Sequence, residues 1–210
     1  MNDLRAPVLL VALPQVLDPH FRRSVVLIVR HDEEGTLGFI INRRTDLRMI
    51  EVLADLKILE EADQPEEPEE IAGDEEQVGE SADRVYYGGP VLPQLGSVFF
   101  SVDEAPEVLD GEGVTEVMPG IAMTQQIIDL DRLYRDPPRY LRLYQGCAGW
   151  GQDQLMDEIL RNDWLTVPAT EELIFAEEPE SVWERAVRGA GIDPASLPSW
   201  TTPADAADAN

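Results

Sequence analysis

The chain has 210 residues, of which 43% are hydrophobic, so it can bury one sizeable core and we expect a single domain. Sixteen basic and 42 acidic side chains give a formal net charge of −26 at pH 7. Such a charge repels phosphate groups, which argues against direct binding to DNA, RNA or an anionic membrane surface. We therefore expect the partner to be a protein or a small molecule.

The single cysteine and the shortness of the apolar run near the start of the sequence favour a cytoplasmic location. Cys147 is the only cysteine, so no disulfide can form within the chain, as is usual in a reducing compartment. The apolar run at residues 6–13 is too short to cross a bilayer and lacks the strongly basic flank of a signal peptide. We interpret it as part of a buried strand and expect a cytoplasmic protein without a membrane segment.

Strands dominate the predicted elements in the first quarter of the chain. Apolar and β-branched residues run through 8–13 and 24–31, as is typical of buried strands. The turn sequence at 32–35 predicts a hairpin that pairs the second strand with 36–41. A helix is predicted over 47–57, because its apolar residues repeat at helical spacing. Its expected buried face holds four residues: Leu47, Ile50, Leu53 and Leu56.

Residues 60–83 interrupt this pattern with twelve acidic side chains and no basic ones. Such a composition cannot support packing, so we expect a mobile surface loop. The rest of the chain still has 30 acidic and 16 basic residues, so the acidity is general. We expect one domain over residues 1–198 and a disordered tail over 199–210, where the residues are small and polar.

Short strands and helices are predicted from residue 84 onward. A strand is expected from 84 and runs into the Gly-Gly-Pro bend at 88–90, and further strands are expected at 97–102, within 114–123 and at 139–145. Helices are expected at 129–135 and at about 152–162, followed by an extended stretch at 164–167 and a last helix. Ser181 and Glu184 have the spacing of a capping box for the last helix. Gly191 suits a left-handed cap at its end.

Residues 146–164, GCAGWGQDQLMDEILRNDW, are the most informative segment. Three glycines stand within six residues around Trp150, which predicts a tight turn at 146–151 followed at once by a helix. Asp157 and Arg161 are expected to pair on that helix. Its expected buried face holds four residues: Leu155, Met156, Ile159 and Leu160.

Five stretches of the sequence carry a resemblance to one known family. They are LLVALP with DPHF (9–14 and 18–21), GTLGFIINRR (35–44), YYGGPV (86–91), GCAGWGQDQLMDEILRNDW (146–164) and VWERAVRGAGID (182–193). In this order they resemble the AlgH/YqgE-like proteins of bacteria, over about residues 8–193. The most specific stretch is 146–164, with its Gly-x-Ala-Gly-Trp sequence followed by Gln-Leu and a later Trp.

The resemblance implies an α+β fold, in which a mixed, strongly bent sheet curls towards a pseudo-barrel and helices pack outside it. The biochemical activity of this family is not established, and its transcriptional-regulator label comes without a recognisable DNA-binding motif. Two features depart from the family pattern. Residues 60–83 resemble an enlarged loop, and Cys147 stands where an aromatic residue is common, so thiol chemistry there would not be a family property.

Glycine-rich bends and arginines within these motifs are the candidate ligand-binding residues. The candidates are Asn42, Arg43, Gly88, Gly89, Pro90, Gly146, Gly149, Trp150 and Gly151, with Arg44 beside them. Arginine pairs can clamp a carboxylate or phosphate, and the amides of 146–151 can cradle an anion. The alternatives are structural: the arginines pair with the chain's own acids, and the glycines only permit bends. Asp153 would also repel an anion.

Cys147 beside a helix start is a candidate catalytic nucleophile, with His31 or His20 as its imidazole partner. The alternative is that this cysteine is a small buried hydrophobic residue. Two histidines and one cysteine lack a transition-metal spacing, so we expect no metal and no cofactor. The predicted function is a non-catalytic ligand- or protein-binding module that could regulate indirectly. The alternative is a thiol-dependent or hydrolytic enzyme that uses Cys147.

Overall fold

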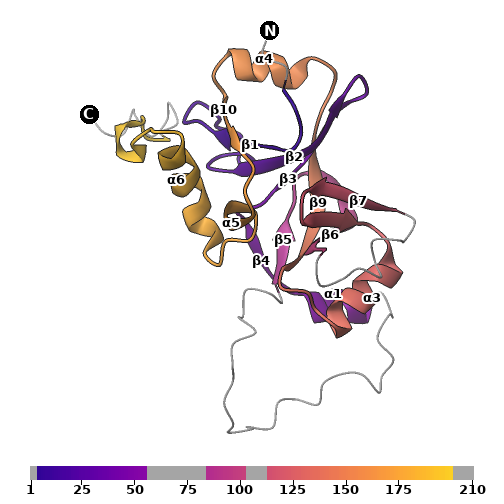
Figure 1. The fold of residues 1–210 in the computed structure, drawn as a ribbon. Coiled ribbons are helices and arrows are strands. Elements are labelled where there is room, and N and C mark those ends of the chain that lie inside the picture. The colour runs from indigo at the N-terminus through magenta and orange to yellow at the C-terminus, as the bar shows by residue number, and fades with distance from the viewer. Residues whose placement is uncertain (1–3, 56–83, 103–112, 201–210) are drawn as a thin grey trace, which may run out of the picture. The chain divides into compact units, whose positions relative to one another are not determined.

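The structure, a computed structural model, describes residues 4–55, 84–102 and 113–200 (Figure 1). The chain divides into two compact units, each built from separate stretches of sequence. Unit 1 comprises residues 1–43, 87–94 and 146–210, and unit 2 comprises residues 44–86 and 95–145. The predicted acidic loop at 60–83 lies outside the described residues.

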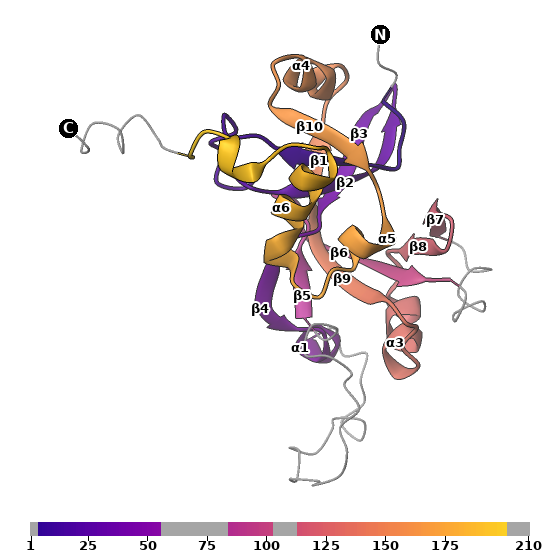
Figure 2. The same cartoon turned by 60° about the vertical axis from the view of Figure 1, so that its left-hand side comes forward.

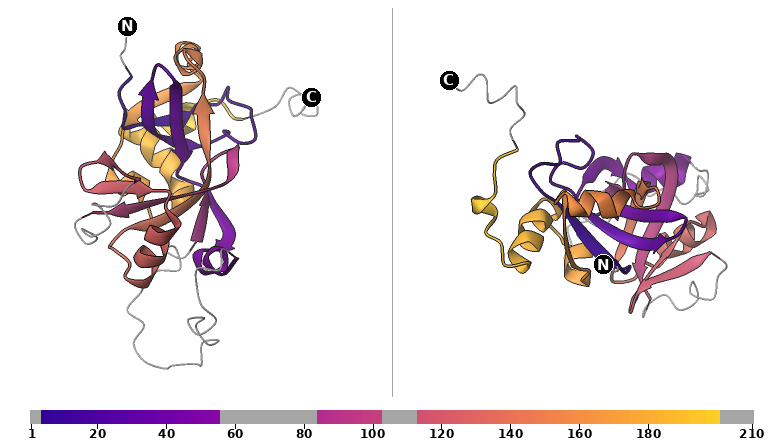
Figure 3. Two further views of the ribbon diagram at one scale, coloured as in Figure 1. Left: turned by 90° about the vertical axis from the view of Figure 1, so that its right-hand side faces the viewer. Right: turned by 90° about the horizontal axis from the view of Figure 1, so that it is seen from above.

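Five strands form the sheet of unit 1 in the spatial order β10–β1–β2–β3–β9. They are β1 (Val8–Ala12), β2 (Val25–Asp32), β3 (Gly35–Ile40), β9 (Leu141–Trp150, from Gly146 onward) and β10 (Trp164–Pro168). Each neighbouring pair is antiparallel, and Figure 3 shows the β2–β3 hairpin beside the end of β9. The predicted strands and hairpin are confirmed, because their β-branched and apolar residues pack on a sheet.

The described helices of unit 1 follow strand β9 in the sequence. They are α4 (Gln154–Leu160), α5 (Glu171–Ile174), α6 (Pro179–Gly189) and the 3-10 helix η2 (Pro194–Ser196). Helix α6 packs beside β1 (Figure 2), where Trp183 Nε1 donates to the carbonyl of Ala12 at 2.8 Å. This hydrogen bond satisfies a buried indole and fixes the helix on the sheet.

The ends and faces of these helices differ partly from the predictions. Helix α6 begins at Pro179, so Ser181 lies inside it and the predicted capping box is wrong. The left-handed cap is confirmed, because Gly191 has φ +79° and two N–H groups bond back to the last turn. On α4, Leu155 is buried but Leu160 is 77% exposed. Arg161 pairs with Asp163 at 2.9 Å instead of with the predicted Asp157.

A hydrophobic cluster of buried residues forms part of the core of unit 1. Its buried members are Leu10, Ala12, Val26, Ile28, Ile40, Ala148, Trp150, Leu155 and Trp164. Trp200 also packs in this unit, because it is only 9% exposed, donates to the carbonyl of Val16 and lies edge-to-face against Trp183. The prediction of a disordered tail from residue 199 is therefore wrong for Trp200, whose large apolar ring stabilises the end of the chain. Residues 201–210 lie outside the described part of the chain.

The described part of unit 2 contains strands and two helices around its own core. Its elements are β4 (Arg44–Arg48), α1 (Met49–Asp55), β5 (Arg84–Tyr87, up to Tyr86), β6 (Val91–Ser101, from Leu95 onward), β7 (Val114–Met118), β8 (Ile121–Thr124), α3 (Ile127–Arg135) and the first half of β9. The core holds Met49, Leu53, Val85, Val98, Phe100, Ala122, Leu130, Leu133, Leu141 and Leu143. The helix predicted at 47–57 starts two residues later because 44–48 form β4, and Leu47 is therefore exposed.

None of the helices in the described ranges is long and apolar enough to cross a bilayer.

Candidate functional site

The glycine-rich segment at 146–151 continues strand β9 through Trp150, so the predicted tight turn is wrong. Residues Ala148–Trp150 pair in antiparallel register with Gly38, Leu37 and Thr36 of β3. Gly146 occurs here because glycine in a strand also allows another backbone to approach closely. Composition alone does not distinguish that use of glycine from a turn.

Gly88, Gly89 and Gly146 place two backbone segments in direct contact. A Cβ at Gly88 would lie 2.2 Å from the carbonyl oxygen of Gly146, and a Cβ at Gly146 would lie 2.4 Å from that of Gly89. The carbonyl of Gly88 also accepts the N–H of Ile40 at 2.8 Å. These three predicted glycines therefore lie together, but their two backbone segments contact each other and leave no room for a ligand between them. Pro90 follows this contact and is exposed.

Glu158 on α4 forms hydrogen bonds with two tryptophans, one in the strand before this helix and one in the strand after it. Its Oε2 accepts the Nε1–H of both Trp150 and Trp164, each at 2.8 Å. The two indole rings lie edge-to-face at 5.9 Å, and Phe21 packs against both. One carboxylate thus satisfies two nearly buried indole donors, which would otherwise lose their hydrogen bonds to water. Trp150 is part of the core rather than a ligand contact.

The side chain of Gln154 accepts a hydrogen bond from the backbone N–H of Gly151, one of the amides considered for anion binding. Its Oε1 accepts the N–H of Gly151 at 3.1 Å, and its Nε2 donates to Glu158 at 3.0 Å. Asp153, with φ +63°, begins α4 in a left-handed conformation. The amide of Gly151 therefore already has a partner, and the carboxylates of Asp153 and Glu158 stand near it in the chain. The side chain of Gln154 shapes the chain between β9 and α4.

Asn42 fixes the backbone on both sides of Ser24, the residue before β2. Its Oδ1 accepts the N–H of Val25 at 2.8 Å, and its Nδ2 donates to the carbonyl of Arg23 at 2.9 Å. Arg23 has φ +57°, a conformation that costs energy for a residue with a Cβ. Asn42 therefore positions Arg23 through its two hydrogen bonds to the backbone.

Arg43 also holds the loop at 18–23 through hydrogen bonds from its side chain to backbone carbonyl groups. Its Nη1 donates to the carbonyl of Pro19 at 3.0 Å, and its Nη2 donates to that of Arg22 at 2.8 Å. Burial lowers the pKa of Arg43, while Tyr87 and Asp18 act in the opposite direction. Since the guanidinium is committed to two carbonyl groups, Arg43 holds Arg22 in place. Arg44 belongs to unit 2, where it begins β4.

His20 and Tyr87 secure the other side of this loop. Tyr87 Oη and His20 Nδ1 lie 2.7 Å apart, and their rings stack with centroids 6.0 Å apart. The backbone N–H of His20 donates to Asp18 Oδ1 at 2.7 Å, which closes the local turn. Burial raises the pKa of Tyr87, so its phenol keeps its proton near neutral pH. The loop at 18–23 is therefore held by side chains at 42, 43 and 87.

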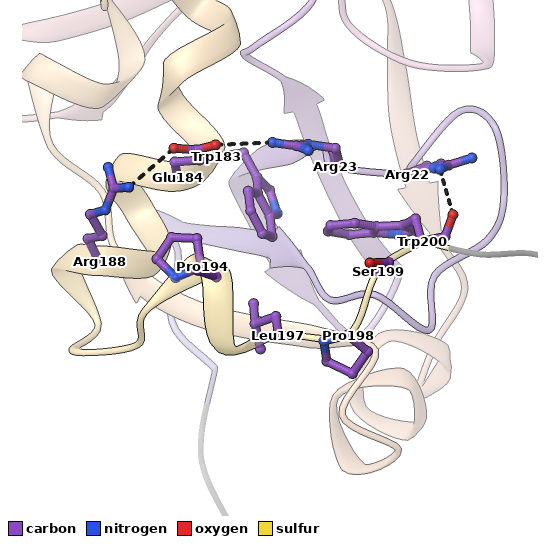
Figure 4. A pocket seen from close by; sticks show the side chains of 11 residues that line it. Arg22, Arg23, Trp183, Glu184, Arg188, Pro194, Leu197, Pro198, Ser199 and Trp200 are labelled. Atoms are coloured by element: carbon purple, nitrogen blue, oxygen red, sulfur yellow. Dashed lines mark hydrogen bonds and ion pairs between the residues drawn. The ribbon is translucent and has the colours of Figure 1, made fainter.

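The loop at 18–23 carries two arginines that line a pocket of about 490 Å³ within unit 1. We call it the Arg–Trp pocket, and Figure 4 shows its lining from the loop, α6, η2 and the residues after η2. The lining consists of Arg22, Arg23, Trp183, Glu184, Arg188, Pro194, Ala195, Leu197, Pro198, Ser199 and Trp200. Its volume lies in the range of sites that bind small molecules.

Arginine and tryptophan contacts give this pocket its chemistry. The guanidinium of Arg23 lies over Trp183 at 4.8 Å from the ring centroid and over Trp200 at 5.7 Å. Arg22 Nη2 donates to the carbonyl of Trp200 at 2.7 Å. Three arginines and one glutamate line the pocket, so its charged side chains carry a net positive charge in a chain of net charge −26. Such a site attracts anionic groups.

The residues of the Arg–Trp pocket were not identified from the sequence. Trp183, Glu184 and Arg188 were interpreted only as part of the last helix, and Trp200 as part of the tail. A usable signal was the density of aromatic and arginine residues in WERAVR (183–188), close to a further tryptophan. That signal could not show which distant residues complete the pocket, because Arg22 and Trp200 are 178 positions apart.

Cys147 and His31 show no catalytic arrangement in the described part of the chain. Cys147 is 3% exposed, and its Sγ lies 3.6 Å from the carbonyl oxygen of Val91. Burial raises the pKa of this thiol. His31 Nδ1 instead bonds to Thr36 Oγ1 at 2.7 Å across the β2–β3 hairpin. The alternative of a small buried hydrophobic residue fits Cys147 better than a nucleophile.

Alkylation of Cys147 by iodoacetamide at pH 7.5 is expected to be at least tenfold slower than alkylation of glutathione. Burial limits access, and a raised pKa reduces the thiolate fraction at this pH. Mass spectrometry of timed samples gives the rate, and the same protein in guanidinium chloride should react as fast as a free thiol. Labelling of the folded protein at the glutathione rate would restore the thiol-enzyme alternative.

No group of three or more His, Cys, Asp or Glu side chains is placed to hold a metal ion within the described ranges.

Comparison with known proteins gives matches along most of the chain. Residues 9–195 match the family described as AlgH-like. A UPF0301 protein of Myxococcus xanthus is 37% identical over 192 residues, which cover 91% of this chain and 94% of that protein. A UPF0301 protein of Methylococcus capsulatus is 34% identical over 195 residues, with 90% and 91% covered. Neither name states an activity.

Two solved structures resemble this one. The solution structure of the AlgH protein from Pseudomonas aeruginosa has a TM-score of 0.68 and 28% identity, and the match covers 92% of this chain and 94% of that one. A crystal structure of a Corynebacterium diphtheriae protein has a TM-score of 0.67 at 24% identity, with 96% and 93% covered, and shares the fold. The predicted α+β fold class is confirmed.

Proposed function

The chain belongs to the AlgH-like family, as the order of its motifs predicted, and from this premise we propose that it is a non-catalytic binding module. The Arg–Trp pocket receives an anionic group of a small molecule or of a partner protein. The surface predicted from the glycine-rich bends is set aside, because those glycines contact each other.

One observation carries this proposal: Arg22, Arg23 and Arg188 line a pocket together with two tryptophans in a strongly acidic chain. The planar guanidinium of arginine matches the geometry of carboxylate and phosphate groups. The aromatic rings that line the pocket supply apolar contact area. The described lining holds a single carboxylate and no histidine or cysteine. These side chains suit binding rather than acid–base or nucleophilic chemistry.

A cytoplasmic location and an indirect regulatory role complete the proposal. The single cysteine is unpaired with another thiol and buried, which fits a reducing compartment. The net charge of −26 disfavours a direct DNA contact. Regulation would therefore act through a protein that presents an acidic group, or through a small anion that changes the binding of such a protein.

A thermal-shift screen with millimolar carboxylates, inorganic phosphate and nucleotides tests the proposal. At least one anion is expected to raise the melting temperature by about 2 °C or more, because a ligand that binds only the folded state stabilises it. Arg188→Gln should abolish the shift. Arg185→Gln should retain it, since Arg185 lies on the same helix but donates to the carbonyl of Glu172 outside the pocket. An unchanged melting temperature with every anion would overturn the proposal.

A further inference from the structure

Glu184 places a carboxylate between two arginines of the Arg–Trp pocket. Its Oε1 lies 3.5 Å from Arg23 Nη2, and its Oε2 lies 3.4 Å from Arg188 Nη2 (Figure 4). Each oxygen thus faces a different guanidinium, so the carboxylate bridges the loop and α6. A ligand carboxylate that entered the pocket would meet the same two guanidinium groups.

Arg23 keeps its position independently of Glu184. Its backbone is held by Asn42, and its guanidinium lies over the rings of Trp183 and Trp200. Stacking on aromatic faces orients the plane of the guanidinium and leaves its N–H groups free to point along that plane. If the carboxylate of Glu184 moved away, the cation would remain in place for another acceptor.

The contacts that retain Glu184 are weak. Both are longer than the 2.7–2.9 Å that is typical of a charge-assisted hydrogen bond. The side chains are 43% exposed for Glu184, 52% for Arg23 and 63% for Arg188. Water screens ion pairs at such exposures, and they contribute little to stability. An incoming carboxylate with shorter contacts can therefore displace Glu184.

We propose that Glu184 is a resident substitute for the ligand, and that a ligand carboxylate replaces it between Arg23 and Arg188. This inference rests on the proposed function, because it names the ligand class of the same pocket. The ligand carries a carboxylate, either as a small dicarboxylate or as an aspartate or glutamate side chain of a partner protein. Glu184 then moves into solvent, and its competition lowers the affinity for weaker anions.

Titrations of the wild type and three variants with glutarate, a blocked hexaglutamate peptide and inorganic phosphate test this inference. Glu184→Gln is expected to bind the preferred carboxylate at least fivefold more tightly than the wild type, because the competing charge is gone. Arg188→Gln should bind it at least fivefold more weakly. Asp157→Asn changes the net charge by the same amount as Glu184→Gln but lies exposed on α4, so it should leave the affinity unchanged.

The indole N–H signals of the four tryptophans provide a local readout by nuclear magnetic resonance. Those of Trp183 and Trp200 should shift on titration, whereas those of Trp150 and Trp164, both bonded to Glu158, should not. Binding of glutarate supports a small dicarboxylate, and binding of hexaglutamate alone supports an acidic protein segment.

The two proposals fail in different ways. Carboxylate binding by the wild type with equal or weaker binding by Glu184→Gln would overturn the role of Glu184 and leave the binding module intact. Phosphate binding as tight as carboxylate binding would overturn the carboxylate assignment. Absence of binding by the wild type and by Glu184→Gln, with native circular dichroism spectra for both, would overturn the proposed function itself.

Discussion

Gly146→Ala is expected to lower the free energy of unfolding by about 4 kcal/mol, the largest effect of any single methyl group proposed for this chain. Two costs add at this position. The new Cβ would lie 2.4 Å from the carbonyl oxygen of Gly89, so one of two buried backbone segments must move. The φ of +73° is also unfavourable for any residue with a Cβ. Urea denaturation followed by circular dichroism measures the loss.

Gly149→Ala is the matched control, because it adds the same methyl group to the same strand. Its Cβ would meet Val91 Cγ2 at 3.8 Å, an ordinary van der Waals contact. We expect a change of less than about 1 kcal/mol. Gly189→Ala, at the end of α6 with no atom within 4 Å of the added Cβ, should likewise be neutral or slightly stabilising. Equal losses for Gly146→Ala and Gly149→Ala would contradict the proposed backbone contact.

Glu158→Ala is expected to lower the free energy of unfolding by about 3 kcal/mol, because two indole donors lose their shared acceptor. Trp150 and Trp164 are only 6% and 4% exposed, so water cannot easily replace the carboxylate. Glu158→Gln keeps one side-chain oxygen that can accept a hydrogen bond, and we expect roughly half of that loss. Chemical denaturation monitored by tryptophan fluorescence gives both values.

Asp157→Ala provides the control for this effect on the same helix. Asp157 precedes Glu158 in the sequence and is exposed, so its removal should change the free energy of unfolding by about 0.5 kcal/mol or less. The indole N–H signals of Trp150 and Trp164 should shift together in Glu158→Ala and remain in place in Asp157→Ala. Independent behaviour of these two signals would argue against a shared carboxylate.

Local patterns in the sequence were sufficient for most elements of the fold. The β2–β3 hairpin, the left-handed cap at Gly191 and the strands around Pro119-Gly120 follow from β-branched runs, turn residues and glycine conformations that act over a few neighbours. The family match also rests on short motifs in a fixed order. Predictions failed where one residue type has two structural uses.

The glycines of β9 illustrate that limit. Gly146 and Gly149 are equivalent in the sequence, and both were interpreted as part of one turn. In the structure Gly146 faces the carbonyl oxygen of Gly89, whereas a Cβ at Gly149 would have room. The difference depends on which distant residues pack against each position, and Gly89 stands 57 residues before Gly146 in the chain.

The sequence by itself determined the strong negative charge and the β2–β3 hairpin, because these depend on composition or on short-range pattern. The order of its motifs determined the family, and the resemblance to that family implied the α+β class. Only the tertiary structure decided that Asn42 and Arg43 position a loop, that Glu158 serves two tryptophans, and that Arg23, Glu184 and Trp200 share a pocket. The contacts of Asn42, of Arg43 and within the pocket join residues from separate parts of the chain. Their partners are selected by packing of the whole unit, which no local pattern specifies.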